Sequence, residues 1–258
     1  MSDMPTPTSP SRIEAEFPWL KMATADEQRF VDEALRYFED PGTVHHALAF
    51  LGRPIEALSE KLPAPAKKII EKSTDHALNL ALQSALKLER SPKLPHRPLA
   101  AAIGGIGGFF GWAGLAADLP LTTVLILRGI ADQASRHGFD LGARETQLEC
   151  LSVFGMGARD SKSDDAMNSS YFASRAAITK VLADSSALAL QRMIAQIAVR
   201  FKMRVSQKVL AEAIPLAGAV GGAGINYLFM DFFIKTADYH FGIRAMERKY
   251  NSAGTVTE

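Results

Sequence analysis

The amino-acid sequence predicts an all-α fold, a single-domain bundle of about eight to ten helices. Three observations lead to this prediction. Apolar residues recur at helical spacing through most of the chain, and no segment alternates β-branched and polar residues as a strand would. Two apolar segments, 99–117 and 218–224, are crowded with glycine. With 258 residues, 47% of them hydrophobic, the chain can bury one large core.

Charge and cysteine content narrow the possible functions. The chain carries 29 basic and 28 acidic side chains, a net charge of +1, so no overall field attracts a nucleic acid backbone and we expect no nucleic acid partner. The single cysteine, Cys150, excludes an internal disulfide and a cysteine-only zinc site, which is typical of a reducing compartment. We therefore expect a cytoplasmic protein.

The chain is expected to divide into a disordered lead-in at 1–22, a helical domain at 23–250 and a frayed tail at 251–258. The lead-in is rich in proline, serine and threonine and has no apolar signal segment. Order is predicted to begin at Thr24, which can cap a helix with Asp26 and Glu27 in its first turn.

Further helices are expected in the first half of the chain. Their predicted ranges are 43–51, 54–62 and 65–89, and the last carries a broad apolar stripe with lysines on the opposite side. Residues 91–98 contain three prolines and are expected to be an irregular connector.

The central arm, residues 99–117, carries no charge and is close to the length that crosses a bilayer core. Six glycines and few large apolar residues weaken it as a membrane span. A second crossing would also place Arg128 and Asp132 inside the membrane. The sequence therefore favours an arm packed within the protein over a transmembrane hairpin.

The glycines of the two apolar segments recur four residues apart, the spacing that lets two helix backbones approach closely. We expect them to pack helices together in a soluble core, and the alternative is a mobile arm that opens onto lipid. The predicted packing glycines are Gly104, Gly107, Gly108, Gly111, Gly114, Gly218 and Gly222.

Four polar residues stand in apolar surroundings in the sequence and are expected to be buried. Asp118 precedes Leu119-Pro120 and is predicted to cap the helix that follows. Arg128 lies in an apolar run and needs either a carboxylate partner or access to water. Asp231 is the expected partner, with Asn226 as a further member of the cluster.

Later helices are expected at 140–154, 166–182, 185–199 and 226–250. No acidic residue occurs between Asp184 and Glu212, and this interval contains five basic residues. They are Arg192, Arg200, Lys202, Arg204 and Lys208. We interpret them as candidates for contact with an anionic membrane, the alternative being an ordinary solvated helix face.

The motifs of common chemistries are missing. The glycine cluster lacks the Gly-Lys-Ser/Thr ending of a phosphate-binding loop, and G-x-S-x-G and H-E-x-x-H do not occur. The six histidines are scattered and are expected to be surface or capping residues, and Cys150 is expected to be an inert core thiol. We predict no catalytic residue, no cofactor and no metal site.

Several runs of the sequence resemble the EcsC family of bacterial proteins. They are GGIGGFFGWAGLAADLPLTTVLILRGIADQASRHGFDL, RETQLECLSVFGMG, VSQKVLAEAIPLAGAVGGAGINYLFMDFF and ADYHFGIRAME, and the resemblance covers about 60–248. It implies a bacterial accessory role linked to a membrane and to an ABC exporter, and it transfers no active site.

We therefore expect a non-catalytic helical protein at the cytoplasmic membrane face, with anionic lipid or a membrane transporter as partner. Two alternatives stay open. One is a soluble helical domain with an apolar pocket for a lipid or similar ligand. The other is a hydrolase built on Asp118, Arg128 and Asp231.

Overall fold

The computed structural model describes residues 10–39, 95–109, 111–153, 167–184 and 218–254, with six single positions between 68 and 83. This part of the chain is helical and contains no strand, which confirms the all-α prediction. Its elements are α1 (Pro10–Glu16), the 3-10 helix η1 (Pro18–Met22), α2 (Ala25–Glu39), α5 (His96–Phe109), α6 (Gly111–Arg136), α7 (Arg144–Val153), α8 (Met167–Asp184) and α10 (Gly218–Gly254). The count of eight to ten stays a prediction.

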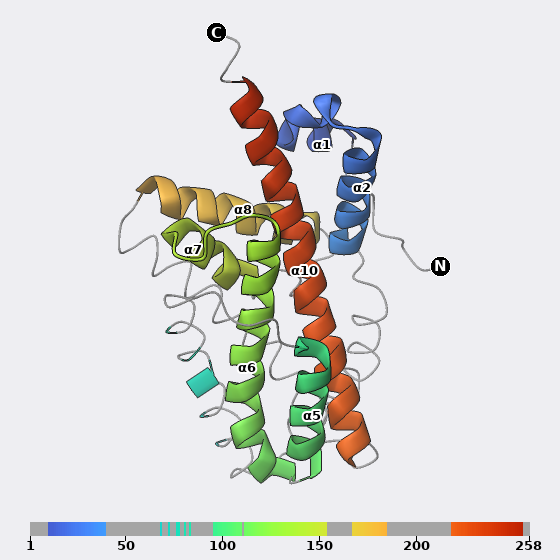
Figure 1. The fold of residues 1–258 in the computed structure, drawn as a ribbon, viewed down its shortest axis with the longest axis vertical. Coiled ribbons are helices and arrows are strands. Elements are labelled where there is room, and N and C mark those ends of the chain that lie inside the picture. The colour runs from blue at the N-terminus through green and yellow to red at the C-terminus, as the bar shows by residue number, and fades with distance from the viewer. Residues whose placement is uncertain are drawn as a thin grey trace.

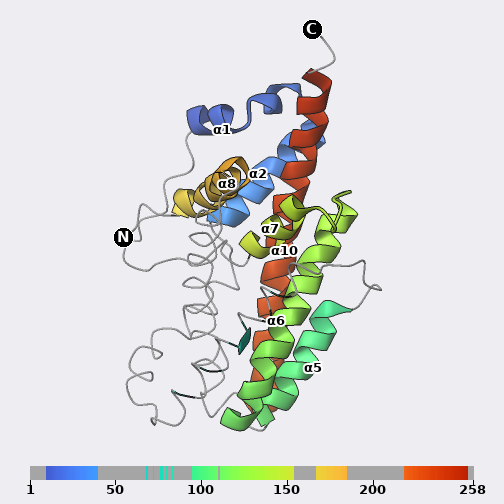
Figure 2. The ribbon, with the colours of Figure 1, turned by 90° about the vertical axis from the view of Figure 1, so that its left-hand side faces the viewer.

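Helix α10 is the axis around which the other described helices are arranged (Figure 1). Helices α5 and α6 lie beside its first half and form the lower end of the molecule in both side views (Figures 1 and 2). Helix α5 makes more extensive contact with α10 than any other described helix does. The upper half of α10 is surrounded by η1, α2, α7 and α8.

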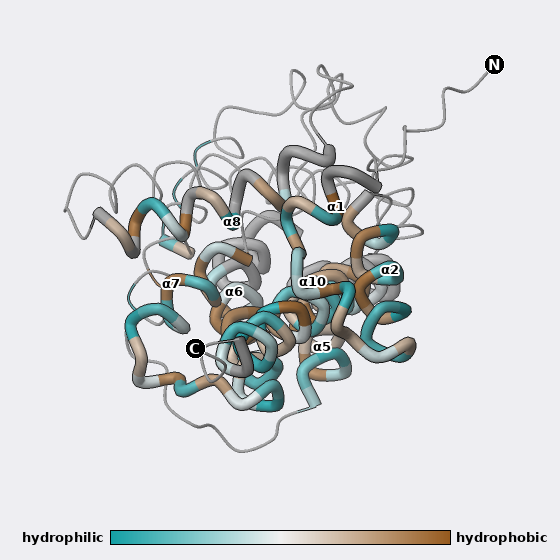
Figure 3. Tube along the Cα trace, turned by 90° about the horizontal axis from the view of Figure 1, so that it is seen from above, coloured by the Kyte–Doolittle hydropathy of each residue, from teal (hydrophilic) through white to brown (hydrophobic). Residues whose placement is uncertain are grey.

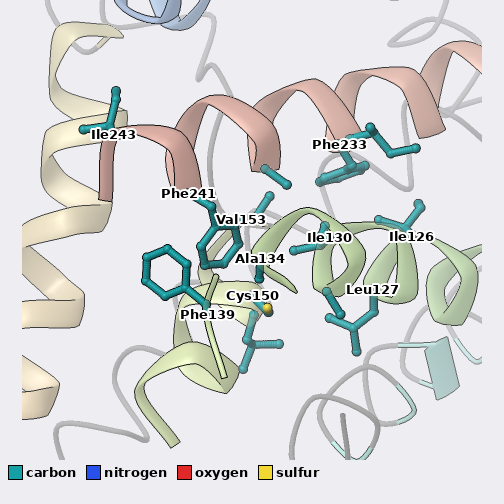
Figure 4. Close-up of a cluster of buried hydrophobic side chains, with 14 of the residues drawn as sticks. Ile126, Leu127, Ile130, Ala134, Phe139, Cys150, Val153, Phe233, Phe241 and Ile243 are labelled. Atoms are coloured by element: carbon teal, nitrogen blue, oxygen red, sulfur yellow. The ribbon is translucent and has the colours of Figure 1, made fainter. Parts of the chain in front are cut away.

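The described core lies where α6, α7 and α10 meet (Figure 4). Ile126 and Ile130 of α6 are almost fully buried, as are Phe233 and Phe241 of α10. Phe139, which follows α6, packs edge-on against Phe241 with ring centroids 5.1 Å apart. Each such side chain contributes about 1.5–3 kcal/mol by leaving water. The core therefore holds α6 to the middle of α10.

The N-terminal segment is more ordered than predicted. Residues 10–22 form α1 and η1, and both Phe17 and Trp19 are buried. Trp19 stacks on Tyr250 of α10 with ring centroids 5.6 Å apart. The expected disordered lead-in is therefore wrong for this part, because two large aromatic side chains offset the entropy cost of ordering a proline-rich segment.

Helix α2 begins as the sequence predicts. Thr24 Oγ1 accepts a hydrogen bond from the Glu27 backbone N–H at 3.3 Å, and Glu27 Oε2 accepts one from the Thr24 N–H at 2.9 Å. This reciprocal capping satisfies two donors at the helix start. Viewed from above, α2 turns the more hydrophobic side of its tube toward α10 (Figure 3). Val31 and Leu35 of α2 are buried.

The central arm departs from the prediction. It forms two helices that pack against each other, α5 ending at Phe109 and α6 beginning at Gly111. Asp118 and Pro120 lie inside α6, so the predicted helix cap at Asp118 is wrong. A proline inside a helix removes one backbone hydrogen bond and its ring crowds the carbonyl four residues earlier, yet α6 continues past Pro120, which is buried. Helix α5 also begins at His96, inside the expected connector, because Pro98 is tolerated in a first turn.

The end of α6 agrees with the sequence prediction, whereas the start of α7 and the end of α10 differ from it. Gly138 ends α6 with φ of 79°, a conformation that favours glycine, and its N–H donates to the Ser135 carbonyl oxygen at 3.1 Å. Helix α7 begins at Arg144 rather than at Asp140, whose carboxylate instead accepts from the Gly142 N–H at 3.0 Å. Helix α10 continues to Gly254, into the predicted frayed tail.

Candidate functional site

A level of paired charges crosses the bundle where α5 begins. His96 Nε2 lies 2.7 Å from Asp132 Oδ2 of α6. Arg97 Nε donates to Asp231 Oδ1 of α10 at 2.7 Å, and Lys235 Nζ lies 3.0 Å from Asp231 Oδ2. These pairs place the start of α5 level with the second half of α6 and the middle of α10. With the exposed Arg128, they form what we call the charged rim: His96, Arg97, Arg128, Asp132, Asp231 and Lys235.

Arg128 does not take the predicted position. Its side chain is exposed, and Asp231 instead pairs with Arg97 and Lys235. The expected buried pair of Arg128 with Asp231 is therefore wrong. The neighbouring Gly129 faces inward instead, where an added Cβ would lie 3.3 Å from Ile234 Cγ1 of α10. That orientation turns Arg128 toward water. Access to water was the predicted alternative to a carboxylate partner for this lone guanidinium.

Below the charged rim, the three central helices carry almost no charge. We call residues 98–109 of α5, 111–127 of α6 and 218–230 of α10 the charge-poor end. The sequence contains no charged residue in the α5 and α10 sections and one, Asp118, in the α6 section. In Figure 1 these three sections form the lower tip of the molecule.

Large apolar side chains are exposed on the charge-poor end. Leu121 of α6 is 57% exposed, Tyr227 of α10 is 43% exposed and Leu99 of α5 is 38% exposed. Leu121 lies seven residues before Arg128, which puts both on one face of α6, and Tyr227 lies eight before Lys235 on a shared side of α10. On both helices, an exposed apolar residue therefore lies about two turns below an exposed cation.

Asn226 is fully buried, as predicted, and its Nδ2 donates to Thr122 Oγ1 of α6 at 3.4 Å. It thus links α6 and α10 within the charge-poor end rather than joining Arg128. Asp231, also expected to be buried, is partly buried in the charged rim. The side chain of Asp118 lies outside the described part of the chain, so its burial stays a prediction. The set expected of a hydrolase is therefore not assembled, because Arg128 is exposed and Asp231 is held by other cations.

The predicted packing glycines are only partly covered by the structure. Gly104 is buried in α5, which packs along α10. Gly107, Gly108, Gly111 and Gly114 lie in α5 or α6, and Gly218 and Gly222 lie in the first turns of α10, but their surroundings are not described. Their packing role stays a prediction. A close backbone approach is seen at Gly129, which the sequence pattern did not single out.

A second group of charges lies at the upper end, where its members are buried or partly buried except for the exposed Glu145. We call it the buried ion network, and it consists of Glu145 and Glu149 of α7, Tyr171 and Arg175 of α8, and His240, Arg244 and Glu247 of α10. Arg244 is its centre: it donates to Glu149 at 2.8 Å, to Glu247 at 2.9 Å and to Glu145 at 2.9 Å.

The rest of the buried ion network connects α8. Arg175 donates to Glu247 and, at 3.3 Å, to the Tyr171 hydroxyl. Its guanidinium also lies 5.2 Å from the centre of the Phe17 ring, so the N-terminal segment covers it. His240 Nε2 lies 3.5 Å from Glu149 Oε2, with no hydrogen bond to either ring nitrogen from the described residues.

Burial and pairing act in opposite directions on these groups. Burial alone would raise the pKa of Glu149, but contacts with His240 and Arg244 outweigh it and hold that pKa below its usual value. Burial lowers the pKa of His240, and the nearby Glu149 does not fully offset it. The arrangement therefore favours an ionised Glu149 and a neutral His240 near neutral pH.

The buried ion network is built to hold helices together. Glu149 is 1% exposed and His240 0%, so a substrate in solution cannot reach either side chain. Each acidic group is engaged by Arg244 or Arg175. Within the described residues, no three His, Cys, Asp or Glu side chains are grouped as a metal site.

Sequence reasoning missed this network. It treated His240 and His96 as surface or capping residues, and both are buried, so that prediction is wrong for them. The partners lie on helices about 70–100 residues apart in the sequence, so no local spacing brings them together. The one available signal was four charged residues, at 244, 247, 248 and 249, following the apolar run of α10.

Cys150 agrees with the prediction of an inert core thiol. It is fully buried in α7, and burial raises the pKa of the thiol well above its usual value. A thiol held in its protonated form is a poor nucleophile.

Two predictions concern contact with a membrane, and the described residues bear on one of them. Arg192, Arg200, Lys202, Arg204 and Lys208 lie outside the described residues, so their role in membrane contact stays a prediction. Among the helices that are described, none is both long enough and apolar enough to cross a membrane.

Comparison with protein-family models identifies a family for this chain. The model of the EcsC protein family matches residues 56–246, a range that holds the charged rim, the charge-poor end and most of the buried ion network. No curated protein and no solved structure matches the chain significantly. The matched range is well over half of the sequence, and the chain belongs to the EcsC protein family.

Proposed function

We propose that this protein is a non-catalytic accessory protein that binds the cytoplasmic face of a membrane through its charge-poor end. The observation that carries the proposal is the vertical separation of charge in the central helices. Three helices end together in sections with one charged residue among them, and the ionic side chains gather at the charged rim above.

The exposed residues favour lipid over water at this end. Leu121 and Tyr227 are 57% and 43% exposed, on different helices and on the same end of the molecule. Burying one large apolar side chain contributes about 1.5–3 kcal/mol to binding, and the contributions of two or three such residues add together. Exposed Arg128 and Lys235 lie above them, where long basic side chains reach headgroups while their stems stay in apolar surroundings.

A non-catalytic role is supported by the way the ionisable side chains are engaged. The carboxylates of the charged rim are paired with Arg97, Lys235 or His96, and those of the buried ion network with arginine. No described carboxylate in either group combines exposure with freedom from a cation. Such pairing stabilises helix contacts.

The test is flotation of the full-length protein with vesicles of phosphatidylcholine, with and without phosphatidylglycerol. We expect the wild type to float with vesicles and the double variant Leu121→Glu with Tyr227→Glu to bind at least about tenfold more weakly. A charged side chain near the bilayer centre costs about 2.5 kcal/mol or more, so even a fraction of that penalty gives this loss.

The matched control is Met22→Glu. Met22 is 63% exposed but lies at the upper end, so its replacement adds the same charge away from the proposed contact. Thermal unfolding of all variants checks that they fold, as expected for exposed positions. The proposal fails if the wild type stays with the unbound protein, or if Met22→Glu and the double variant lose binding equally.

The same experiment, together with fractionation of cells, tests the proposed partner. A preference for the phosphatidylglycerol vesicles that weakens in high salt is the expected sign of an anionic lipid partner. The further role beside a membrane transporter stays a prediction from the family resemblance.

A further inference from the structure

We infer that the charge-poor end enters a single leaflet and that the charged rim stops it at the level of the lipid phosphates. This inference rests on the proposed function and adds the depth and the orientation of the contact. Its occupant is one lipid leaflet rather than a soluble ligand.

The first step is that the charged rim marks one level of the bundle. His96 meets Asp132, and Arg97 meets Asp231, so α5, α6 and α10 are tied together there. A Cβ at Gly129 would lie within 3.6 Å of His96 and also of α10 side chains, which confirms that the three helices meet closely at this level. The sections below it can therefore be measured from a common plane.

The second step is the length of those sections. At about 1.5 Å per residue, 98–109 of α5 extends about 18 Å below Arg97, and 218–230 of α10 extends about 20 Å below Asp231. One leaflet, half of a bilayer that measures about 40–45 Å with its headgroups, is about 20–22 Å thick. The α5 and α10 lengths agree with one leaflet, so these two sections reach the bilayer centre when the rim is level with the headgroups. The α6 section is longer, about 26 Å below Arg128, and it carries Asp118 about 15 Å below Arg128, so entry costs about 2.5–3.5 kcal/mol for this one carboxylate.

The third step is the order of exposed side chains along the axis. Leu121 lies about 10 Å below Arg128 along α6, and Tyr227 lies about 12 Å below Lys235 along α10. With the cations at the headgroups, both apolar side chains fall within the hydrocarbon of that leaflet, which is about 15 Å deep. Deeper entry would pull Arg97, Asp132 and Asp231 into hydrocarbon, at a cost that rises with each charge.

The experiment measures depth at single sites. Cysteine is introduced at Leu121, Tyr227, Arg128, Lys235 or Met22, and each variant is labelled with a fluorophore. Cys150 stays in place, because a fully buried thiol with a raised pKa labels poorly, and the unmodified protein gives the background. Vesicles then carry nitroxide quenchers either on the headgroup or deep on the acyl chain.

We expect acyl-chain quenchers to act most strongly at 121 and 227 and headgroup quenchers at 128 and 235, a depth difference of about 10–12 Å. The label at 22 should be quenched by neither. Equal depths at 121 and 128 would mean that the helices lie flat on the surface and would overturn the inference while membrane binding survives. Deep quenching at 235 would overturn it in the other direction.

Failure of the proposed function, membrane binding itself, would give a different result. If the labelled proteins do not bind vesicles at all, the proposed function fails, and with it the inferred depth of the charge-poor end in the leaflet. If they bind and the depth gradient is missing, only the orientation inferred here fails. The flotation measurement on the same labelled samples separates these two outcomes.

Discussion

The two ends of this molecule handle charge in opposite ways. At the upper end, α7 and α10 bury Glu149 and Glu247, and the partly buried Arg244 and Arg175 connect them. At the lower end, the central helices leave Leu121 and Tyr227 exposed and keep ionic groups at the rim. Buried charges stabilise a fold only when they are fully paired, so the upper end is suited to hold helices together. The lower end, with apolar side chains facing outward, is suited to an apolar partner.

Glycines in α10 show the same difference. At Gly242, in the upper half, an added Cβ would lie 2.5 Å from Phe30 Cζ of α2. At Gly224, in the charge-poor end, nothing lies within 4 Å of the same added atom. One helix therefore contains a glycine required by close packing and another that the described packing does not require.

The largest effect is expected from breaking the buried ion network. Arg244→Met should destabilise the protein by about 3–5 kcal/mol, because Glu149 would stay buried without its guanidinium partner. Urea unfolding measures the loss. The loss should shrink as the pH falls, since protonation removes the buried negative charge of Glu149.

A control separates this effect from the loss of any ion pair. Lys21→Met breaks a pair with Glu14 at 3.4 Å in which both side chains are well exposed, and it should cost less than about 1 kcal/mol. Equal losses in the two variants would show that the network does not hold the upper end. Replacing Arg244 and Glu149 together with apolar residues should recover much of the stability.

The glycine comparison gives effects of opposite sign and intermediate size. Gly242→Ala should cost about 1–3 kcal/mol, because the new methyl group displaces the Phe30 ring. Gly224→Ala should stabilise the protein by up to about 1 kcal/mol, because alanine loses less entropy in a helix. Thermal unfolding of the two variants beside the wild type is sufficient, and two changes of the same sign would contradict the packing difference.

The smallest effect concerns Glu27, which joins α2 to the end of α10. Hydrogen bonds from Lys249 and Tyr250, at 2.8 and 2.6 Å, and from the backbone of Thr24 lower its pKa from 4.5 to about 2. A carboxylate whose pKa is lower in the folded state stabilises the protein above its unfolded pKa. That contribution should be full above about pH 4.5 and disappear as the pH falls toward 2.

The comparison with Glu27→Gln isolates that contribution. The Tm of the variant should lie below that of the wild type at neutral pH, and the difference should close between about pH 4.5 and 2. A Tm difference that is unchanged at low pH would show that the carboxylate charge does not stabilise this contact. The flotation and depth measurements described above test the lower end in the same way.

Local features were predictable because their partners lie within a few residues. The Thr24 cap, the glycine end at Gly138 and the helical character of most of the chain follow from local chemistry. The division of this run into α5, which ends at Phe109, and α6, which begins at Gly111, was not predictable, since an apolar run rich in glycine is compatible with one helix or with two. Order in residues 10–22 also depended on Tyr250, more than 200 residues away.

The candidate site was predicted in composition but not in geometry. The uncharged segments and the isolated Asp231 are visible in the sequence. Whether Arg128 pointed inward depended on the rotation of α6 about its own axis, and Gly129 decided it by taking the close contact with α10. Arg97, in a proline-rich stretch, became the partner of Asp231 only because α5 begins there.

By itself, the sequence determined that the chain is helical, which residues are apolar, and where charge is missing along it. Those properties depend on the spacing of side chains a few positions apart, which helix geometry converts directly into faces. Tertiary structure alone decided which charges meet, that three uncharged sections share one end, and that His240 and Glu149 are buried together. These outcomes depend on how helices are rotated and stacked, and the energies that decide stacking arise between residues far apart in the chain.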